Sequence, residues 1–247
     1  MVGMLSDIGN YRKINEDYVN FLEDEHLKVY VIADGMGGHN AGEVASRMAV
    51  ESTMEYIRLN KDYSSVEELL VDSILYSNKK IYELSNVDHE MNGMGTTITV
   101  CLIKDCKIVV ANVGDSSCYL IKDSKITKVT KDHSLVQQLI DEGSITELEA
   151  VYHPNKNIIT RALGTNIELK VDTFNLEIQE SYKIIMCTDG LSNEVTPREM
   201  YDIAIHNDVD TSCKKLVELS KSRGGRDNIS VIVFEGECED GRNSTGK

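Results

Sequence analysis

Short apolar runs recur along the chain, and their length and composition predict β-strands. Six runs rich in β-branched and aromatic residues are bounded by glycine or polar residues, as strands in a sheet usually are. The second and third runs are separated by only three residues, which favours a hairpin. We expect strands over residues 27–33, 96–103, 107–113, 117–121, 182–188 and 229–235.

A different spacing predicts helices. From Val66 to Leu84 apolar residues recur at intervals of three and four, and Ser64 and Glu67 are placed as a capping box. The segment Thr196–Glu199 reads "TPRE", which offers an N-cap threonine, a proline at the first helical position and a glutamate at the third. Further helices are expected over residues 41–58, 134–142 and 211–222.

The order of these elements determines the fold class that we expect. Strands, two helices, a strand meander, a less regular insert, a strand, two helices and a last strand do not alternate as β-α-β units. We therefore predict an α+β fold of mostly antiparallel sheets covered by helices. No internal repeat or proline-rich linker divides the chain, so we expect a single domain over residues 1–238 and a flexible tail over residues 239–247.

Composition restricts the partners and the compartment. The chain has 41 Asp and Glu against 26 Lys and Arg, a net charge of −15, which disfavours binding to nucleic acid or to anionic membranes. No apolar run approaches the roughly 20 residues that span a bilayer, and no signal peptide is visible. We expect a cytoplasmic protein without membrane insertion. Its cysteines form no C-x-x-C pair and several lie inside apolar runs, so we expect reduced core cysteines.

The stretch "VYVIADGMGGHNAGE" contains the first candidate functional residue. An apolar run ends in the carboxylate of Asp34, which needs a cation or donors if it is buried, and glycines follow that let a ligand approach the backbone. A dinucleotide fingerprint fails because Asn40 stands at the last glycine position, and the G-K-[ST] of a P-loop is missing. On this stretch alone, a plain glycine-rich turn remains an equal alternative.

The same pattern recurs at other strand ends. The run "YKIIMCTDG" ends in Asp189, and "IVVANVGDS" ends in Asp115. Asp227 precedes the last strand beside glycines, and the segment "RKINED" places Asp17 before another short run. Carboxylates that converge repel one another, so they would require divalent cations, and hard oxygen ligands select Mg²⁺ or Mn²⁺.

Six motifs carry a resemblance to a known family. In order they are "RKINED", "ADGMGGHNAGE", "GTT", "NVGDSS", "CTDGL" and "RDNISV", and together they resemble the metal-dependent type 2C (PPM) serine/threonine protein phosphatases, most closely the compact bacterial members. The resemblance runs from about Ser6 to Phe234. It implies a four-layer α-β-β-α sandwich with two Mn²⁺ or Mg²⁺ ions between the sheets. It also implies that a hydroxide bridging the metals attacks the phosphoryl group in line, without a covalent intermediate.

The resemblance also implies roles for individual residues. Arg12 matches the arginine that grips the substrate phosphate, which a guanidinium can do in bidentate fashion. Glu16 matches a residue that supports a metal-bound water from outside the coordination sphere. The matching metal-binding positions are Asp17, Asp34, Asp189, Asp227 and the backbone carbonyl of Gly35, with Asp115 and Asp189 for a weaker third ion.

One departure from the family concerns the general acid. Many eukaryotic relatives have a histidine where this chain has Met36, which cannot donate a useful proton, although bacterial relatives share the methionine. His39 is a candidate acid, and the alternatives are a loop or capping role for His39 and a metal-bound water as the acid. His133 and His153 fit structural or solvated roles better than contact with substrate. Residues 131–165 match the flap beside the active site, which bacterial relatives use in substrate choice.

The predicted function is therefore a phosphoserine/phosphothreonine protein phosphatase that reverses Ser/Thr kinase signalling. The resemblance implies phosphorylated proteins and a cognate kinase as partners, and we expect a monomer. A non-catalytic phosphoprotein-binding module is the alternative from another class, and the intact set of candidate metal ligands argues against it. A phosphohydrolase of small phosphate esters is a third reading, which would predict better turnover on metabolites than on phosphopeptides.

Overall fold

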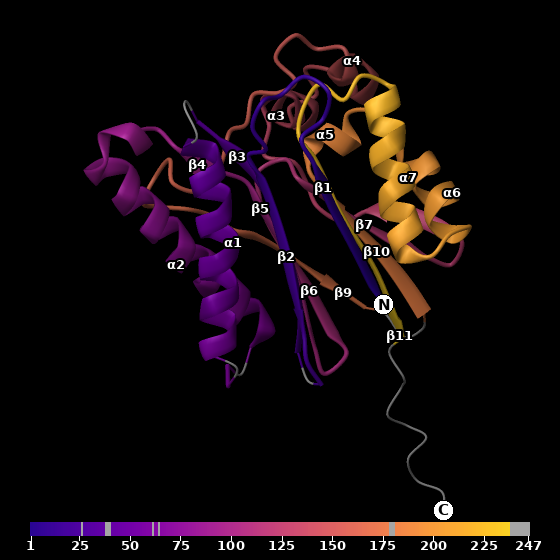
Figure 1. The fold of residues 1–247 in the computed structure, drawn as a ribbon, viewed down its shortest axis with the longest axis horizontal. Coiled ribbons are helices and arrows are strands. Elements are labelled where there is room, and N and C mark those ends of the chain that lie inside the picture. The colour runs from indigo at the N-terminus through magenta and orange to yellow at the C-terminus, as the bar shows by residue number, and fades with distance from the viewer. Residues whose placement is uncertain (26, 38–40, 61, 64, 178–180, 238–247) are drawn as a thin grey trace, which may run out of the picture.

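Two antiparallel β-sheets pack face to face in the computed structural model, which describes residues 1–237 except 26, 38–40, 61, 64 and 178–180 (Figure 1). One sheet has the order β1 (Val2–Asp7), β11 (Ile229–Glu237), β10 (Ser181–Cys187), β7 (Ser117–Lys122) and β8 (Lys125–Lys128). The other has the order β2 (Asp17–Glu23), β3 (Leu27–Met36), β5 (Ile98–Lys104), β6 (Lys107–Val113) and β9 (Asp172–Leu176), and β4 (Gly95–Thr96) pairs with the end of β3.

Helices cover the outer face of each sheet. The long helices α1 (Ala41–Leu59) and α2 (Val66–Val87) lie on the sheet that contains β3, and α6 (Pro197–Ile205) and α7 (Val209–Ser222) lie on the other (Figure 1). The predicted four-layer α+β sandwich is confirmed. The shorter helices are η1 (His89–Met91), α3 (Leu135–Asp141), α4 (Glu147–Val151) and α5 (Asp189–Ser192).

The alternation of side chains along β3 builds two of the three core layers. Val29 and Val31 face α1 and α2, whereas Tyr30 and Ile32 point into the space between the sheets. Tyr30 stacks on Phe234 of β11, with ring centroids 3.6 Å apart, and so joins the two sheets. Because both faces of β3 are buried, its sequence is an almost unbroken apolar run.

All six predicted strands are present, with small shifts of their ends. The strand predicted over 27–33 continues to Met36, so Asp34 and Gly35 lie inside it, and the strand predicted over 96–103 is divided into β4 and β5. Four further strands were not predicted, namely β1, β2, β8 and β9. These four are the edge strands of the two sheets. Edge strands are partly solvated, so polar residues interrupt their apolar pattern.

The predicted start of α2 was wrong by one residue. Ser65 is the N-cap, and its hydroxyl accepts a hydrogen bond from the backbone N–H of Glu68 at 3.2 Å. Ser64 lies outside the described residues. With Ser65 as the N-cap, Glu67 is the second helical residue and cannot close a capping box, and its carboxylate accepts a hydrogen bond from Thr173 of β9.

The capping box at the start of α6 is confirmed. The hydroxyl of Thr196 accepts from the N–H of Glu199, and the Glu199 carboxylate accepts from the N–H of Thr196 at 3.0 Å. We predict that Thr196→Ala lowers the free energy of unfolding by about 1 kcal/mol, because it removes the cap. The measurement is the urea midpoint. Thr196→Ser keeps the hydroxyl and should unfold close to the wild type, and an unchanged midpoint for Thr196→Ala would contradict the prediction.

The described residues bear on two further predictions, which concern membrane-spanning helices and the cysteines. No helix there is long and apolar enough to cross a membrane. The cysteines at 101, 118, 187 and 213 are buried free thiols, as expected for reduced core cysteines, and Cys238 lies outside the described residues.

Candidate active site

Five aspartates from different elements meet at one end of the sandwich. Asp17 opens β2 and pairs in register with Asp34, near the end of β3. Asp189 is the first residue of α5, Asp115 follows β6, and Asp227 lies just before β11. Burial, together with repulsion from the other four carboxylates, raises the pKa of Asp34 well above its ordinary value. The convergence that the sequence only suggested is therefore present.

The other buried carboxylates show the same resistance to ionisation. Burial is the largest cause and neighbouring aspartates add to it, which raises the pKa of Asp17 to about 7, of Asp115 to about 8 and of Asp189 to about 6. The Oδ1 atoms of Asp17 and Asp115 are buried and have no hydrogen-bond partner among the residues that the structure describes. Unpartnered carboxylate oxygens in an all-oxygen donor set fit hard divalent cations.

The described side chains do not form a complete coordination sphere for a metal ion. Among the residues that the structure describes, no three acidic, histidine or cysteine side chains form a closed ligand group around one point. The structure thus brings the predicted carboxylates together and leaves two of their oxygens unpartnered.

A threonine that the motif reading overlooked orients Asp17. The hydroxyl of Thr188, at the end of β10, donates to Asp17 Oδ2 at 2.9 Å and accepts from the backbone N–H of Ser230 at 3.0 Å. This contact crosses from one sheet to the other and leaves Asp17 Oδ1 free. The only signal in the sequence was the position of Thr188 directly before Asp189 in "CTDGL".

The "GTT" motif fixes the backbone of Asp34. The N–H of Asp34 donates to Thr97 Oγ1, and its carbonyl accepts from Thr97 N and from Thr96 Oγ1, each at 2.9 Å. The next residue, Gly35, has no room for a side chain, because a Cβ there would lie 2.1 Å from the carbonyl oxygen of Gly42. Glycine is therefore required where β3 passes the start of α1.

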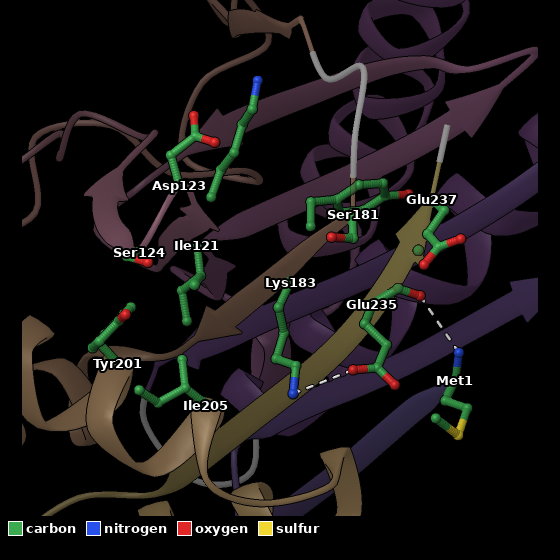
Figure 2. Close-up of a pocket in the computed structure, with 13 residues that line it drawn as sticks. Met1, Ile121, Asp123, Ser124, Ser181, Lys183, Tyr201, Ile205, Glu235 and Glu237 are labelled. Carbon is green, nitrogen blue, oxygen red and sulfur yellow. Dashed lines mark hydrogen bonds and ion pairs between the residues drawn. The ribbon is translucent and has the colours of Figure 1, made fainter. Parts of the chain in front are cut away.

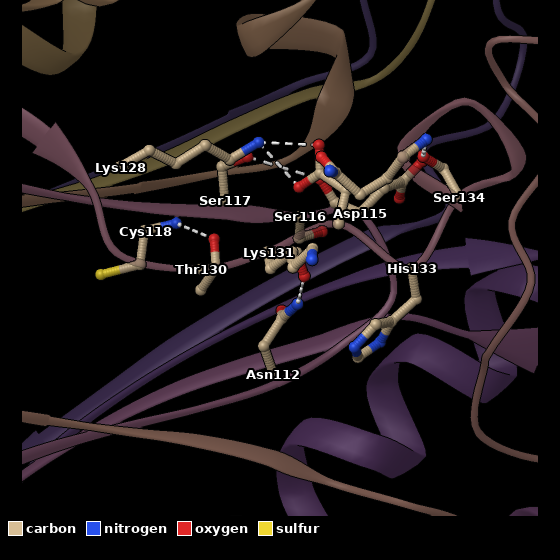
Figure 3. A network of polar contacts seen from close by, with 12 residues as sticks. Asn112, Asp115, Ser116, Ser117, Cys118, Lys128, Thr130, Lys131, His133 and Ser134 are labelled. Carbon is tan, nitrogen blue, oxygen red and sulfur yellow. Dashed lines mark hydrogen bonds and ion pairs between the residues drawn. The ribbon is translucent and has the colours of Figure 1, made fainter. Parts of the chain in front are cut away.

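A buried histidine holds the turn that carries Asp115. Figure 3 shows His133 beside this turn. Its Nδ1 accepts from the backbone N–H of Gly114 at 3.0 Å, and the backbone N–H of His133 donates to the Gly114 carbonyl at 2.9 Å. Its Nε2 lies 3.3 Å from an oxygen of Asp172, which also pairs with Arg161. Burial lowers the pKa of His133. The structural role expected for His133 agrees with these contacts.

Arg12 and Glu16 lie at the rim of the aspartate cluster. Arg12 Nη2 donates to Asp227 Oδ2 at 2.9 Å, and Nη1 lies 3.9 Å from a carboxylate oxygen of Glu16. Glu16 accepts a hydrogen bond from the backbone N–H of Gly42 in the first turn of α1, and burial raises its pKa. The side chain of Arg12 is 48 % exposed, so its guanidinium can meet a substrate.

The candidate acid His39 and the remaining histidine His153 have separate outcomes. His39 lies outside the described residues, so its role stays a prediction, and Met36 ends β3 as a half-buried side chain. His153 is tied locally, since its Nδ1 accepts from the N–H of Asn155 at 3.2 Å. This bond agrees with a structural role for His153.

A hollow of about 230 Å³ opens beside two of the carboxylates. Asp115 and Asp189 line it together with residues of α3 and α4, among them Val136 and Val151, and with Asn193, the C-cap of α5. It is smaller than the roughly 300–1,000 Å³ of ordinary small-molecule sites, so it suits a single side chain better than an organic cofactor. Most of its lining residues lie within the segment 131–165.

A larger hollow of about 570 Å³ lies at the opposite end of the first sheet (Figure 2). Lys183 crosses it, donates to the carbonyl of Ala204 at the end of α6 at 2.8 Å and pairs with Glu235 at 3.2 Å. A cation at a helix C-terminus stabilises that helix, so these contacts have a structural explanation. None of the five clustered aspartates lines this hollow.

The family model described as protein phosphatase 2C matches residues 11–220. The chain belongs to the protein phosphatase 2C family. It is 37 % identical over 235 residues to the serine/threonine phosphatase stp of Listeria monocytogenes serotype 4b, covering 93 % of each chain. The solved structure of the S. agalactiae serine/threonine phosphatase is 34 % identical and has a TM-score of 0.86. The match covers 96 % of this chain and 99 % of that one.

A further member of the 2C family has been solved with metal. The catalytic domain of the phosphatase PstP, in complex with two manganese ions, is 32 % identical with a TM-score of 0.81, and the match covers 94 % of this chain and 96 % of that one. The chain described here is thus a protein serine/threonine phosphatase of the 2C type, as the motifs predicted. Its substrates are phosphorylated proteins.

Proposed function

We propose that the aspartate cluster binds two divalent cations, Mn²⁺ or Mg²⁺, and that Asp115 and Asp189 bind a weaker third ion. The observation that carries this proposal is the pair of buried, unpartnered oxygens on Asp17 and Asp115, in a cluster that repels its own charge. The manganese ions bound to PstP support it. The other ligands would be Asp34, Asp227 and the backbone carbonyl of Gly35.

The residues around the cluster would then share the work of phosphoryl transfer. Bound Mn²⁺ or Mg²⁺ would offset the carboxylate charge and act as a Lewis acid toward water and the phosphoryl oxygens. Arg12 would leave Asp227 to hold two phosphoryl oxygens, because a planar guanidinium fits them in bidentate fashion. Glu16, which Gly42 and Arg12 hold in place, would orient the attacking water. The group that protonates the leaving alcohol would be His39 or a water molecule.

Direct attack by water predicts a kinetic signature. With a phosphothreonine peptide and saturating Mn²⁺, dephosphorylated peptide and inorganic phosphate should be released together in a rapid-quench experiment. No covalent intermediate forms on this route, because the nucleophile is water. A burst of dephosphorylated peptide ahead of phosphate would show a phosphoenzyme and contradict this part of the proposal.

We further propose that the metals depend on the hydrogen bond between Thr188 and Asp17. Thr188→Val keeps the shape and removes the hydroxyl, so it should weaken Mn²⁺ binding by about 10- to 100-fold. Calorimetric titration of the metal-free protein measures this. Thr211→Val is the matched control, because Thr211 also donates to an aspartate, Asp208, at 2.8 Å, but at the surface of α7. Unchanged Mn²⁺ affinity in Thr188→Val would contradict the prediction.

The biological setting follows from the reaction. A protein phosphatase of this class consumes the products of a serine/threonine kinase, so we propose that such a kinase and its substrates are the partners. We propose that residues 1–238 work as one catalytic domain, as a monomer, and that 131–165 act as a flap. A phosphothreonine peptide should be turned over with a higher kcat/KM than phosphorylated metabolites, and the reverse order would favour a small-ester phosphohydrolase.

A further inference from the structure

Both ends of the loop that carries Arg12 are hydrogen-bonded to one buried side chain. Asn228, at the start of β11, is 4 % exposed. Its Nδ2 donates to the carbonyl of Ile8 and to the carbonyl of Ile14, both at 3.0 Å. Its Oδ1 accepts from the backbone N–H of Glu16 at 2.9 Å. One carboxamide therefore closes the loop between β1 and β2 at both ends.

A second asparagine fastens the same loop from within. Asn10 Nδ2 donates to the carbonyls of Lys221 and Gly224, each at 2.9 Å, and its backbone N–H donates to Gly225 at 2.7 Å. These acceptors belong to the end of α7 and the turn after it. The neighbouring Gly9 is packed so closely that a Cβ there would lie 2.1 Å from the Asp227 carbonyl oxygen. The loop is thus held against the chain segment that leads into β11.

Arg12 lies at the outer part of this fastened loop. Its guanidinium bonds to the carboxylate of Asp227, the residue directly before Asn228. The two adjacent residues therefore control Arg12 in different ways: Asp227 contacts the guanidinium, and Asn228 holds both ends of the loop that supports it. A short loop tied at both ends restricts the direction in which its side chains can point.

We propose that Asn228 is a positioning residue for the phosphatase reaction, which acts through the β1–β2 loop to aim Arg12 at the substrate phosphoryl group. The inference rests on the phosphate-binding role proposed above for Arg12. Removing the Asn228 side chain breaks three loop contacts but keeps the backbone bond from Asn228 N–H to Asp227 Oδ1 at 2.8 Å. None of these three contacts involves a carboxylate, so metal binding and Arg12 placement can be separated by experiment.

The test is a double-mutant cycle with a phosphothreonine peptide at saturating Mn²⁺. Asn228→Ala should lower kcat/KM by about 10- to 100-fold, as small misplacements of a positioning group do. Its Mn²⁺ affinity should stay within about twofold of the wild type, because the Asn228 side chain bonds only to backbone groups and to no carboxylate. In an Arg12→Ala background, Asn228→Ala should cause almost no further loss, since residues that act through one another are not additive.

Asn78 provides a matched control, because it is another buried asparagine whose carboxamide is hydrogen-bonded to the backbone of a distant segment. It too is buried, donates to the carbonyls of Asn166 and Ile167 and accepts from the N–H of Gly164. Any effect of Asn78→Ala should add to that of Arg12→Ala, because these hydrogen bonds do not hold the Arg12 loop. Should Asn228→Ala fail to fold, Asn10→Ala cuts the second fastening of the same loop and should show the same non-additivity.

The outcomes separate the two proposals. If Arg12→Ala lowers kcat/KM and Asn228→Ala adds its full loss on top, the positioning role is overturned and the role of Arg12 stands. If Arg12→Ala leaves kcat/KM unchanged, both are overturned. Weaker Mn²⁺ binding in Asn228→Ala, in proportion to its loss of activity, would also overturn the positioning role.

Discussion

Replacing Asp34 by asparagine should abolish turnover and, at the same time, stabilise the metal-free protein. Turnover of a phosphothreonine peptide should fall by about 10³-fold or more, because the central carboxylate of the proposed metal site is lost. Asp34 is repelled by four other carboxylates, so removing its charge relieves the folded state. The melting temperature of the metal-free protein should rise by a few degrees, where about 2–4 °C corresponds to 1 kcal/mol in a chain of this size.

The matched control is Asp105→Asn. Asp105 is exposed in the turn between β5 and β6, and its φ of 49° is one that asparagine also tolerates. This variant should keep both the activity and the melting temperature of the wild type. An Asp34→Asn protein that still turns over the peptide, or one that melts lower than the wild type without metal, would contradict the charge argument.

Stripping the metal ions should reverse the usual effect of pH on stability. The pKa values of Asp17, Asp115 and Asp189, about 7, 8 and 6, lie above the value of about 3.9 for an unfolded aspartate. A group with a raised pKa in the folded state stabilises that state below its unfolded pKa, and this stability is lost as the pH rises through the folded pKa. The melting temperature of the metal-free protein should therefore fall between about pH 5.5 and pH 8.5.

Metal ions should change this trend, because they bind only the ionised carboxylates. The rise in melting temperature on adding Mn²⁺ should be larger at about pH 8.5 than at about pH 5.5. Thermal melts in EDTA and in excess Mn²⁺ across this range measure both effects. A metal-free protein that becomes more stable with rising pH, or an Mn²⁺ effect that is the same at both ends, would contradict the proposed electrostatics.

Much of the fold could be predicted because the central strands are buried on both faces. The apolar runs that became β3 and β11 carry residues of two core layers, so nearly every position is hydrophobic. The edge strands have no such constraint. For example, β8 reads "KITK". Its lysines suit the edge of a sheet, but they interrupt the hydrophobic pattern by which a strand is predicted.

The sequence predicted the part of the candidate site that consists of individual charged residues. The aspartates stood out because each lies at the edge of an apolar run, and the structure brings all five together. Their partners did not stand out. Thr188 and Asn228 act through bonds to residues 171 and 220 positions away in the sequence, and those bonds exist only once the two sheets have packed.

The central claim is that this aspartate cluster is a metal-dependent phosphatase centre, and one measurement tests it directly. Phosphate release from a phosphothreonine peptide is followed with EDTA-stripped protein, to which Mn²⁺, Mg²⁺ or no metal is added, beside an Asp189→Asn variant. We predict release only with added metal and loss of release in the variant. Release without metal, or undiminished release by Asp189→Asn, would contradict the claim.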